Sequence, residues 1–324
     1  MDNICHTLAG AALAESGLGR RTSFGVATLL IGANLPDIDV LAFVGGPLAD
    51  LEWRRGWSHG VVALVVLPFL LTGLMLLMDR ASHRMRRAVI PSEARPGQLL
   101  LLSFVAIASH PLLDLLNTYG VRWLLPWRGE WSYGDTLFII DPWLWLVLGL
   151  GVWFSRKRRH LRERNLVPEV PARRALLVAA AYVGIMFGSG VLARRIAVQE
   201  IQALSPGPIR AIMVAPAPVN PLSRSIVAEQ ADAYRTATFR WLASPHIDAA
   251  TIRKYPVQRP THPAIATATA TEAARRFLDW ARFPTYSIDS GPAGYVVHIV
   301  DLRYATAPGA RFGAVSVPVE MRGQ

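Results

Sequence analysis

The sequence has little cysteine and comparatively few acidic residues. Its 324 residues include a single cysteine, Cys5, which excludes an intrachain disulfide framework and a zinc site made from cysteine pairs. Aspartate and glutamate together number 23, against 34 lysines and arginines, giving a formal net charge of +11. No Gly-rich phosphate-binding loop and no HExxH motif occurs, so these two common nucleotide and metalloprotease patterns are absent as well.

Apolar residues are abundant. They make up 52% of the chain, and the mean hydropathy of +0.29 is too high for an ordinary soluble domain of this length. Four apolar runs are each about long enough to span a membrane, although the third is short. With two weaker candidates at the start, the expected segments are 3–18, 24–44, 61–78, 98–117, 140–155 and 175–193. The sequence therefore predicts an α-helical polytopic membrane domain with about six membrane segments.

Basic residues gather in the loops at one end of these segments. Lysines and arginines crowd residues 80–95 and 156–174, and Arg20 and Arg21 join the first two segments. The positive-inside rule makes these loops cytoplasmic and puts the chain after residue 193 on the outer side. We therefore expect a multi-pass protein of the bacterial inner membrane with a periplasmic or extracytoplasmic C-terminal domain. The net charge follows from topology, so no nucleic-acid partner is expected.

The chain after residue 193 has no further membrane-length apolar run. Its proline-rich beginning is typical of an extended connector. Further on, TEAARRFLDWARF has apolar positions at helical spacing, and YSIDSGPAGYVVHIVDLRYA resembles two strands around a Gly-Pro turn. We therefore predict a transmembrane domain at 1–193, a Pro-rich connector at 194–221 and a small soluble α+β domain at 222–324.

Acidic and imidazole side chains interrupt the apolar segments. A carboxylate at membrane depth is costly unless it faces a protein interior, a partner or a cation. The expected topology brings polar residues from separate segments to one depth, toward the outer face. They are His6, Asn34, Asp37, Asp39, His59, His110, Asp114 and Asp141. This convergence indicates a metal or ion site.

The spacing of these residues supports metal binding. His110 and Asp114 are four residues apart, so a helix presents both on one face to one cation. Asp37 and Asp39 would point to different faces of a regular helix, but Pro36 breaks the helix beside them. A mixed set of histidines and carboxylates suits zinc, manganese or iron, and could hold one or two ions. Such a centre activates water and polarises a phosphoryl or carbonyl oxygen.

Each feature also has a structural alternative. His6 could simply pack between helices, and Ser58 could cap the helix that His59 begins. His110 and Asp114 could hydrogen-bond to each other as interhelical contacts.

The polar residues nearby leave further alternatives. Asp37 and Asp39 could form a structural turn, or a proton or sodium site in a transporter. In the outer loops, Arg55 and Arg122 could hold an anionic substrate or could contact lipid headgroups in general.

Four stretches resemble a known family. His6-Thr7, NLPDID at 34–39, RRGWSHG at 54–60 and SHPLLD at 109–114 resemble the YdjM-like, LexA-regulated, membrane-bound predicted metal-dependent hydrolases. The resemblance covers about residues 1–190, and PVNPLSRSIVAEQADAYRTATF and VVHIVDLRYA look like the outer domain of longer members. It implies a polytopic inner-membrane hydrolase whose metal ligands match His6, Asp37, Asp39, His59, His110 and Asp114.

One position departs from the family pattern. Members commonly have a histidine at the start of HRGxTHS, where this chain has Arg54. If that histidine is a ligand elsewhere, this site has lost a ligand or uses another residue. A looser similarity of the His-x-x-x-Asp helix to zinc-dependent phospholipase C favours phosphoester chemistry.

The leading expectation is a hydrolase of the inner membrane whose metal site opens to the outer face. Its expected partners are membrane lipids, with a lipid or lipid-linked phosphoester as substrate and zinc as the favoured ion, ahead of manganese or iron. We assign catalytic roles to Asp37, Asp39 and Asn34, and substrate binding to Arg55 and Arg122. The alternatives are an ion or metal transporter, which predicts a second polar cluster toward the inner side, and a membrane anchor for the outer domain.

Overall fold

The computed structural model describes residues 1–46, 49, 52–86, 94–161, 167–257, 262–292, 294–304 and 312–320. The chain divides into two compact units. Unit 1 comprises Met1–Leu41 and Trp53–Gly188, and unit 2 comprises Ala42–Glu52 and Ser189–Gln324.

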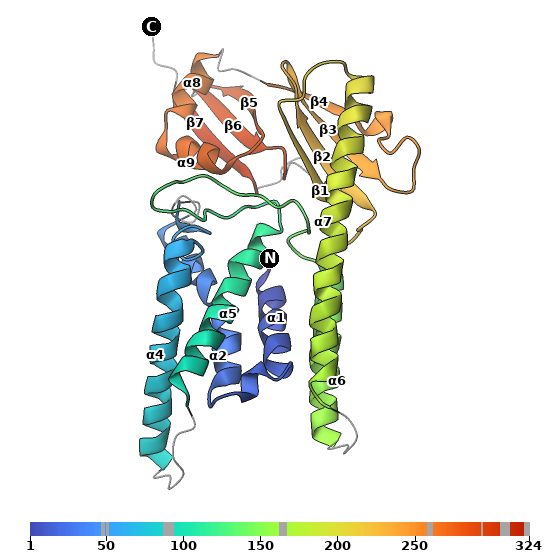
Figure 1. Ribbon diagram of the computed structural model, residues 1–324. Coiled ribbons are helices and arrows are strands. Elements are labelled where there is room, and N and C mark those ends of the chain that lie inside the picture. Colours follow the sequence, from blue (N-terminus) through green and yellow to red (C-terminus); the bar gives the residue numbers. More distant parts are fainter. Residues whose placement is uncertain are drawn as a thin grey trace. The chain divides into compact units, whose positions relative to one another are not determined.

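Unit 1 is helical (Figure 1). Its α-helices are α1 (Asn3–Glu15), α2 (Gly25–Gly32), α4 (Val61–Arg86), α5 (Pro96–Leu115), α6 (Pro142–Leu161) and the first part of α7 (Val170–Leu204). Two 3-10 helices, η1 (Leu18–Arg20) and η2 (Leu35–Gly45), precede and follow α2, although the last residues of η2 belong to unit 2. Helix α5 packs against α2 and α4, while α1 packs against α2 and α6.

Small residues let these helices approach closely. A Cβ atom added to Gly10 on α1 would lie 2.8 Å from the Leu29 carbonyl oxygen on α2, and one added to Gly32 would lie 2.8 Å from Ala106 on α5. Such contacts are typical of membrane helices, where packing replaces the hydrophobic drive between helices. Small residues therefore allow α1 to pack closely against α2, and α2 against α5.

Among the described residues, three helices are long and apolar enough to cross a membrane: α4 over Val61–His83, α5 over Pro96–Leu115, and α7 over Val170–Leu204. Helices α2 and η2 together form a fourth candidate, bent by 43°. The bend lies next to Pro36, as the sequence predicts. Six spans are not confirmed, because α1 has only 13 residues and α6 ends in the charged run RKRRH.

Unit 2 contains two antiparallel sheets. The first has the order β1-β2-β3-β4 and the second β5-β6-β7. Their strands are β1 (Ala211–Pro216), β2 (Ser223–Glu229), β3 (Ala233–Arg240), β4 (Arg253–Pro256), β5 (Pro284–Gly291), β6 (Gly294–Asp301) and β7 (Ala314–Glu320). The 3-10 helix η3 (Ala249–Thr251) precedes β4, and helices α8 (Pro263–Thr269) and α9 (Glu272–Trp280) lie between the sheets in sequence. The C-terminal region is therefore a sheet-containing domain with helices, as expected.

Local sequence explains the elements of unit 2. Helix α9 begins where Thr271 accepts a hydrogen bond from the Ala274 backbone, and it buries Phe277 and Trp280 on one face. The helix and the β5–β6 hairpin predicted from the sequence are both present.

Residues 194–221, expected as a connector, are largely ordered secondary structure. Helix α7 continues to Leu204, and β1 occupies Ala211–Pro216. The helix continues because Ala193, Ala197 and Ile201, spaced four residues apart, are buried against the first sheet. The prolines flank β1 rather than interrupt it, since they lie before Ala211 and from Pro216 onward.

Candidate metal centre

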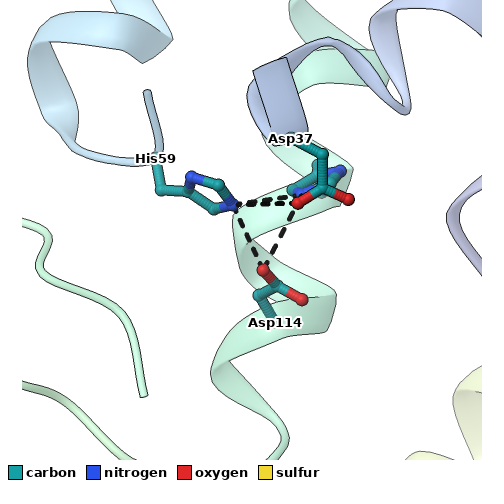
Figure 2. A group of neighbouring side chains, drawn as sticks. Asp37, His59 and Asp114 are labelled. Atoms are coloured by element: carbon teal, nitrogen blue, oxygen red, sulfur yellow. Dashed lines mark hydrogen bonds and ion pairs between the residues drawn. The ribbon is translucent and has the colours of Figure 1, made fainter. Parts of the chain in front are cut away.

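Four polar side chains of unit 1 converge from three elements. Asp37 lies on η2, His59 lies in the turn that precedes α4, and His110 and Asp114 lie one helical turn apart on α5. Each offers one ligand atom, and these four atoms lie within 4.8 Å of one another. Figure 2 shows Asp37, His59 and Asp114 directed toward a common point. We call these four residues the ligand group, because together they could hold a metal ion.

The spacing within the ligand group fits one tetrahedral ion. The Nε2 atom of His59 lies 3.1 Å from His110 Nε2 and 3.2 Å from Asp114 Oδ2. Oδ1 of Asp37 lies 3.5 Å from His110 Nε2 and 3.9 Å from His59 Nε2, and His110 Nε2 is 3.7 Å from Asp114 Oδ2. Ligand atoms about 2.0–2.2 Å from a tetrahedral ion are separated by about 3.3–3.6 Å. The five distances bracket this value, and the sixth pair, Asp37 and Asp114, lies within 4.8 Å.

The histidines are held with the same nitrogen facing inward. His110 Nδ1 lies 2.7 Å from the carbonyl oxygen of Ala33, which can only accept, so Nδ1 carries the proton and Nε2 presents its lone pair. His59 Nδ1 likewise faces Asp39 Oδ2 at 3.2 Å. Two nitrogen lone pairs therefore face each other beside two carboxylate oxygens. Four acceptors with no proton between them form an arrangement complementary to a cation.

Asp39 lies behind His59, outside the ligand group. Its Oδ2 accepts hydrogen bonds of 2.8 Å from both the Arg55 backbone N–H and the Ser58 hydroxyl, and it faces the outer nitrogen of His59. A carboxylate in this position fixes the orientation and tautomer of a ligating histidine and raises its basicity. The geometry therefore gives Asp39 a positioning role.

His6 lies next to the ligand group on the other side of Asp114. Its Nε2 is 3.3 Å from Asp114 Oδ1, and its ring stacks on that of His110 with centroids 3.7 Å apart. The side chain is fully buried, and Nδ1 has no hydrogen-bond partner among the described residues. The structure thus brings His6 to the site, in contact with two members of the ligand group.

Two positive groups contact the ligand group at Asp114, the Met1 amino terminus and Arg55. The Nε of Arg55 lies 3.0 Å from Asp114 Oδ2, and its Nη1 donates to Asn117 Oδ1 at 3.0 Å. The guanidinium also stacks over the Tyr119 ring, 4.6 Å from its centroid. Sequence reasoning missed Asn117 and Tyr119. The spacing of Asn117, three residues after Asp114, was the one available signal.

The other predicted residues contact the scaffold. Asn34 donates to the Leu30 carbonyl and accepts from Thr7, so it links α1 to α2. The Arg122 guanidinium lies over the Trp131 ring at 4.6 Å and donates to the Arg54 carbonyl.

Asp141, expected at the same depth, starts α6. Its Oδ1 accepts from the Leu144 backbone, and its Oδ2 accepts from the Tyr182 hydroxyl at 2.9 Å. A capping role explains this carboxylate.

Comparison with known proteins identifies the family to which the helical part of the chain is related. The sequence model of the YdjM inner membrane protein family matches residues 1–195. The chain belongs to the YdjM inner membrane protein family. The YdjM match contains all four residues of the ligand group and ends within α7, so it leaves out almost all of unit 2.

A curated relative is also detected. This member of the YdjM family is 20% identical over 128 residues to the uncharacterized protein YfhP of Bacillus subtilis (strain 168). The matched region covers 39% of this chain and 36% of YfhP, so the chain spans only about a third of that relative. No solved structure matches the chain.

Proposed function

We propose that this YdjM family member is a membrane-bound, divalent-metal-dependent hydrolase that acts on a lipid or lipid-linked phosphoester. The observation that carries the proposal is the ligand group, in which four acceptor atoms from three elements are spaced to fit one ion. Two imidazole nitrogens and two carboxylate oxygens favour zinc, with manganese and iron as alternatives. A divalent ion bound there supplies Lewis-acid activation of water and of a phosphoryl or carbonyl oxygen.

The approach to the ligand group supports a reactive role. His59, His110 and Asp114 have no exposed side-chain surface, whereas the Asp37 side chain is 15% exposed. We propose that substrate and water reach the centre along Asp37. Because four protein ligands would fill a tetrahedral site, a catalytic ion bound here would also have to accept water as a fifth ligand.

The surrounding residues supply orientation and charge. In the proposal, Asp39 holds His59 and the Ala33 carbonyl holds His110, so both Nε2 atoms stay directed at the ion. Arg55, fixed by Asn117 and beside Asp114, partly balances the carboxylates and offers a guanidinium to an anionic substrate.

An apolar groove supports a lipid as the substrate. It has a volume of about 430 Å³ and lies between α4 and α5, with Leu64, Phe69, Gly97 and Phe104 among its lining residues. On both helices the groove begins about five or six residues from a histidine of the ligand group, or about 8–9 Å along the helix axis. Half of a bilayer's hydrocarbon core is about 15 Å thick. An acyl chain whose headgroup lies at the ligand group would therefore reach the groove.

The first test is metal content. Detergent-purified protein should contain close to one equivalent of zinc, manganese or iron, and Asp37→Ala and His110→Ala should lose it. Asp232→Asn, which changes an exposed carboxylate in unit 2, is the matched control and should keep it. A wild-type protein that stays metal-free after incubation with each of these ions would overturn the proposal.

The second test is hydrolysis. Metal-loaded protein in mixed micelles should release phosphate or a headgroup from phospholipid or lipid-phosphate substrates, and His110→Ala should not. Replacing Gly97 with leucine should impair long-chain substrates more than short-chain ones, while leaving metal content unchanged, because it narrows the groove and leaves the ligand group untouched. Metal-dependent ion uptake into proteoliposomes without any hydrolysis would refute the enzyme and favour a transporter.

A further inference from the structure

A second polar cavity lies at the other end of α5. It has a volume of about 390 Å³ and is lined by Arg20, Arg21, Thr22, Arg95 and Gln98. Arg95 is the residue that precedes α5, whereas His110 of the ligand group is near the end of that helix. The two lie about 15 residues, or about 22 Å, apart along the helix. This cavity, which we call the arginine pocket, is therefore separate from the metal centre.

The arginine pocket is held together by a defined contact. The backbone N–H of Arg95 donates to the Thr22 hydroxyl at 2.8 Å, which joins the start of α5 to the segment between η1 and α2. This bond links residues 73 positions apart in the sequence. The three arginines are thus brought to one cavity by the fold and are not neighbours in a single basic run.

The positive charge of the arginine pocket is only partly balanced. Arg20 forms an ion pair with Glu169. Among the residues that the structure describes, neither Arg21 nor Arg95 has an acidic partner. Guanidinium groups bind phosphate well, because their fork of donors matches its oxygens. The pocket is therefore complementary to an anion with phosphate-like oxygens.

Two further features of α5 add to this complementarity. No side chain caps the start of the helix, where Arg95 is the N-cap residue and a proline follows. The free backbone N–H groups of the first turn carry partial positive charge. The side-chain oxygen of Gln98 is buried and has no hydrogen-bond partner among the described residues. A ligand with both phosphate oxygens and hydroxyl groups would satisfy all of these groups.

We propose that the arginine pocket binds the phosphate headgroup of an anionic membrane lipid. A lipid is favoured over free phosphate because the pocket lies at the end of a membrane-length helix, where headgroups are found. Gly97, adjacent to Gln98 of the pocket, also lines the apolar groove between α4 and α5, so acyl chains have an apolar surface beside the pocket. The site does not depend on the proposed hydrolase activity.

The test compares lipid retention by native mass spectrometry. Full-length protein in detergent is mixed with phosphatidylglycerol or phosphatidylcholine, and bound lipid is counted. Wild-type protein should retain one phosphatidylglycerol in preference to phosphatidylcholine. The double variant Arg21→Gln/Arg95→Gln should bind phosphatidylglycerol about 30-fold more weakly, since each arginine near a membrane surface contributes about fivefold.

The matched control is Arg80→Gln, which removes an exposed arginine on α4 outside the pocket. It should bind phosphatidylglycerol like the wild type, and the metal content of all variants should be unchanged. Equal retention of the two lipids, or equal weakening by Arg80→Gln, would overturn the proposal and leave only general attraction to headgroups. Millimolar inorganic phosphate could instead displace the lipid from the wild type but not from the double variant. That result would identify free phosphate as the ligand and would also overturn the proposal.

Discussion

Replacing Asp39 with asparagine separates the two kinds of carboxylate at the metal centre. In the structure Asp39 contacts His59 Nδ1, the Ser58 hydroxyl and the Arg55 N–H through a single oxygen, whereas Asp37 belongs to the ligand group. An asparagine can keep one acceptor oxygen in this place but loses the negative charge. His59 would therefore stay in position with a less basic Nε2.

The expected magnitude follows from this geometry. Mutating a residue that orients a metal ligand typically costs 10–100-fold in metal affinity, which corresponds to about 1.4–2.7 kcal/mol of binding free energy. Asp39→Asn should accordingly weaken binding by this factor and still reach full stoichiometry when metal is in excess. Asp37→Ala removes a ligand atom, so it should reduce the stoichiometry itself.

The assay is a competition titration of zinc against a fluorescent chelator in detergent, with Asp232→Asn as a control whose affinity should match the wild type. Thermal unfolding of the metal-free proteins checks that each variant is folded. If Asp39→Asn fails to reach full stoichiometry at any zinc concentration, then Asp39 is a ligand and the positioning role is wrong. If Asp39→Asn binds zinc with the same affinity as the wild type, Asp39 does not influence His59 as a ligand, and the positioning role is also wrong.

Three further predictions concern the same structure. Ser58→Ala should weaken metal binding less than Asp39→Asn does, because it removes one of the contacts that fix Asp39, and the same titration would measure it. Chelation should lower the melting temperature, since an ion present at 100 times its dissociation constant stabilises the folded state by about 2.7 kcal/mol; adding zinc back should restore it. Asp301→Ala leaves the buried Arg303 guanidinium without its carboxylate partner, 2.7 Å away, and should destabilise unit 2 by about 3–5 kcal/mol in a denaturant titration.

The sequence predicts the composition of the metal centre better than its internal arrangement. His110 and Asp114 could be paired because helical periodicity places them on one face, and the structure has them on α5. The different positions of Asp37 and Asp39 could not be predicted, because they depend on the 3-10 geometry of η2. With three residues per turn, side chains two apart point in directions about 120° from each other. One carboxylate thus reaches the ligand group while the other lies behind His59.

The fold shows the same difference between local pattern and tertiary packing. Apolar run length was enough to predict the helical part, and the helical spacing of apolar residues predicted the α9 helix. It did not predict that α7 continues beyond its apolar run, because that depends on Ala197 and Ile201 packing against a sheet formed by later residues. Proline content alone suggested a connector there. The contacts of Arg55 with Asn117 and Tyr119 likewise arise only when two loops meet.

The ligand atoms at the metal centre decide which cation it suits. Asp37, Asp39 and Asp114 contribute three negative charges, and two positive groups, Arg55 and the Met1 amino terminus, contact Asp114. With both positive groups charged, one negative charge remains, and its burial is costly unless a cation compensates it. Charge alone therefore gives no preference between a monovalent and a divalent ion. Magnesium and calcium prefer oxygen ligands, whereas imidazole suits zinc and the transition metals, so the two imidazole nitrogens of the ligand group favour zinc or a transition metal. These nitrogens select the kind of ion that a hydrolase would use, which counts against a sodium transporter.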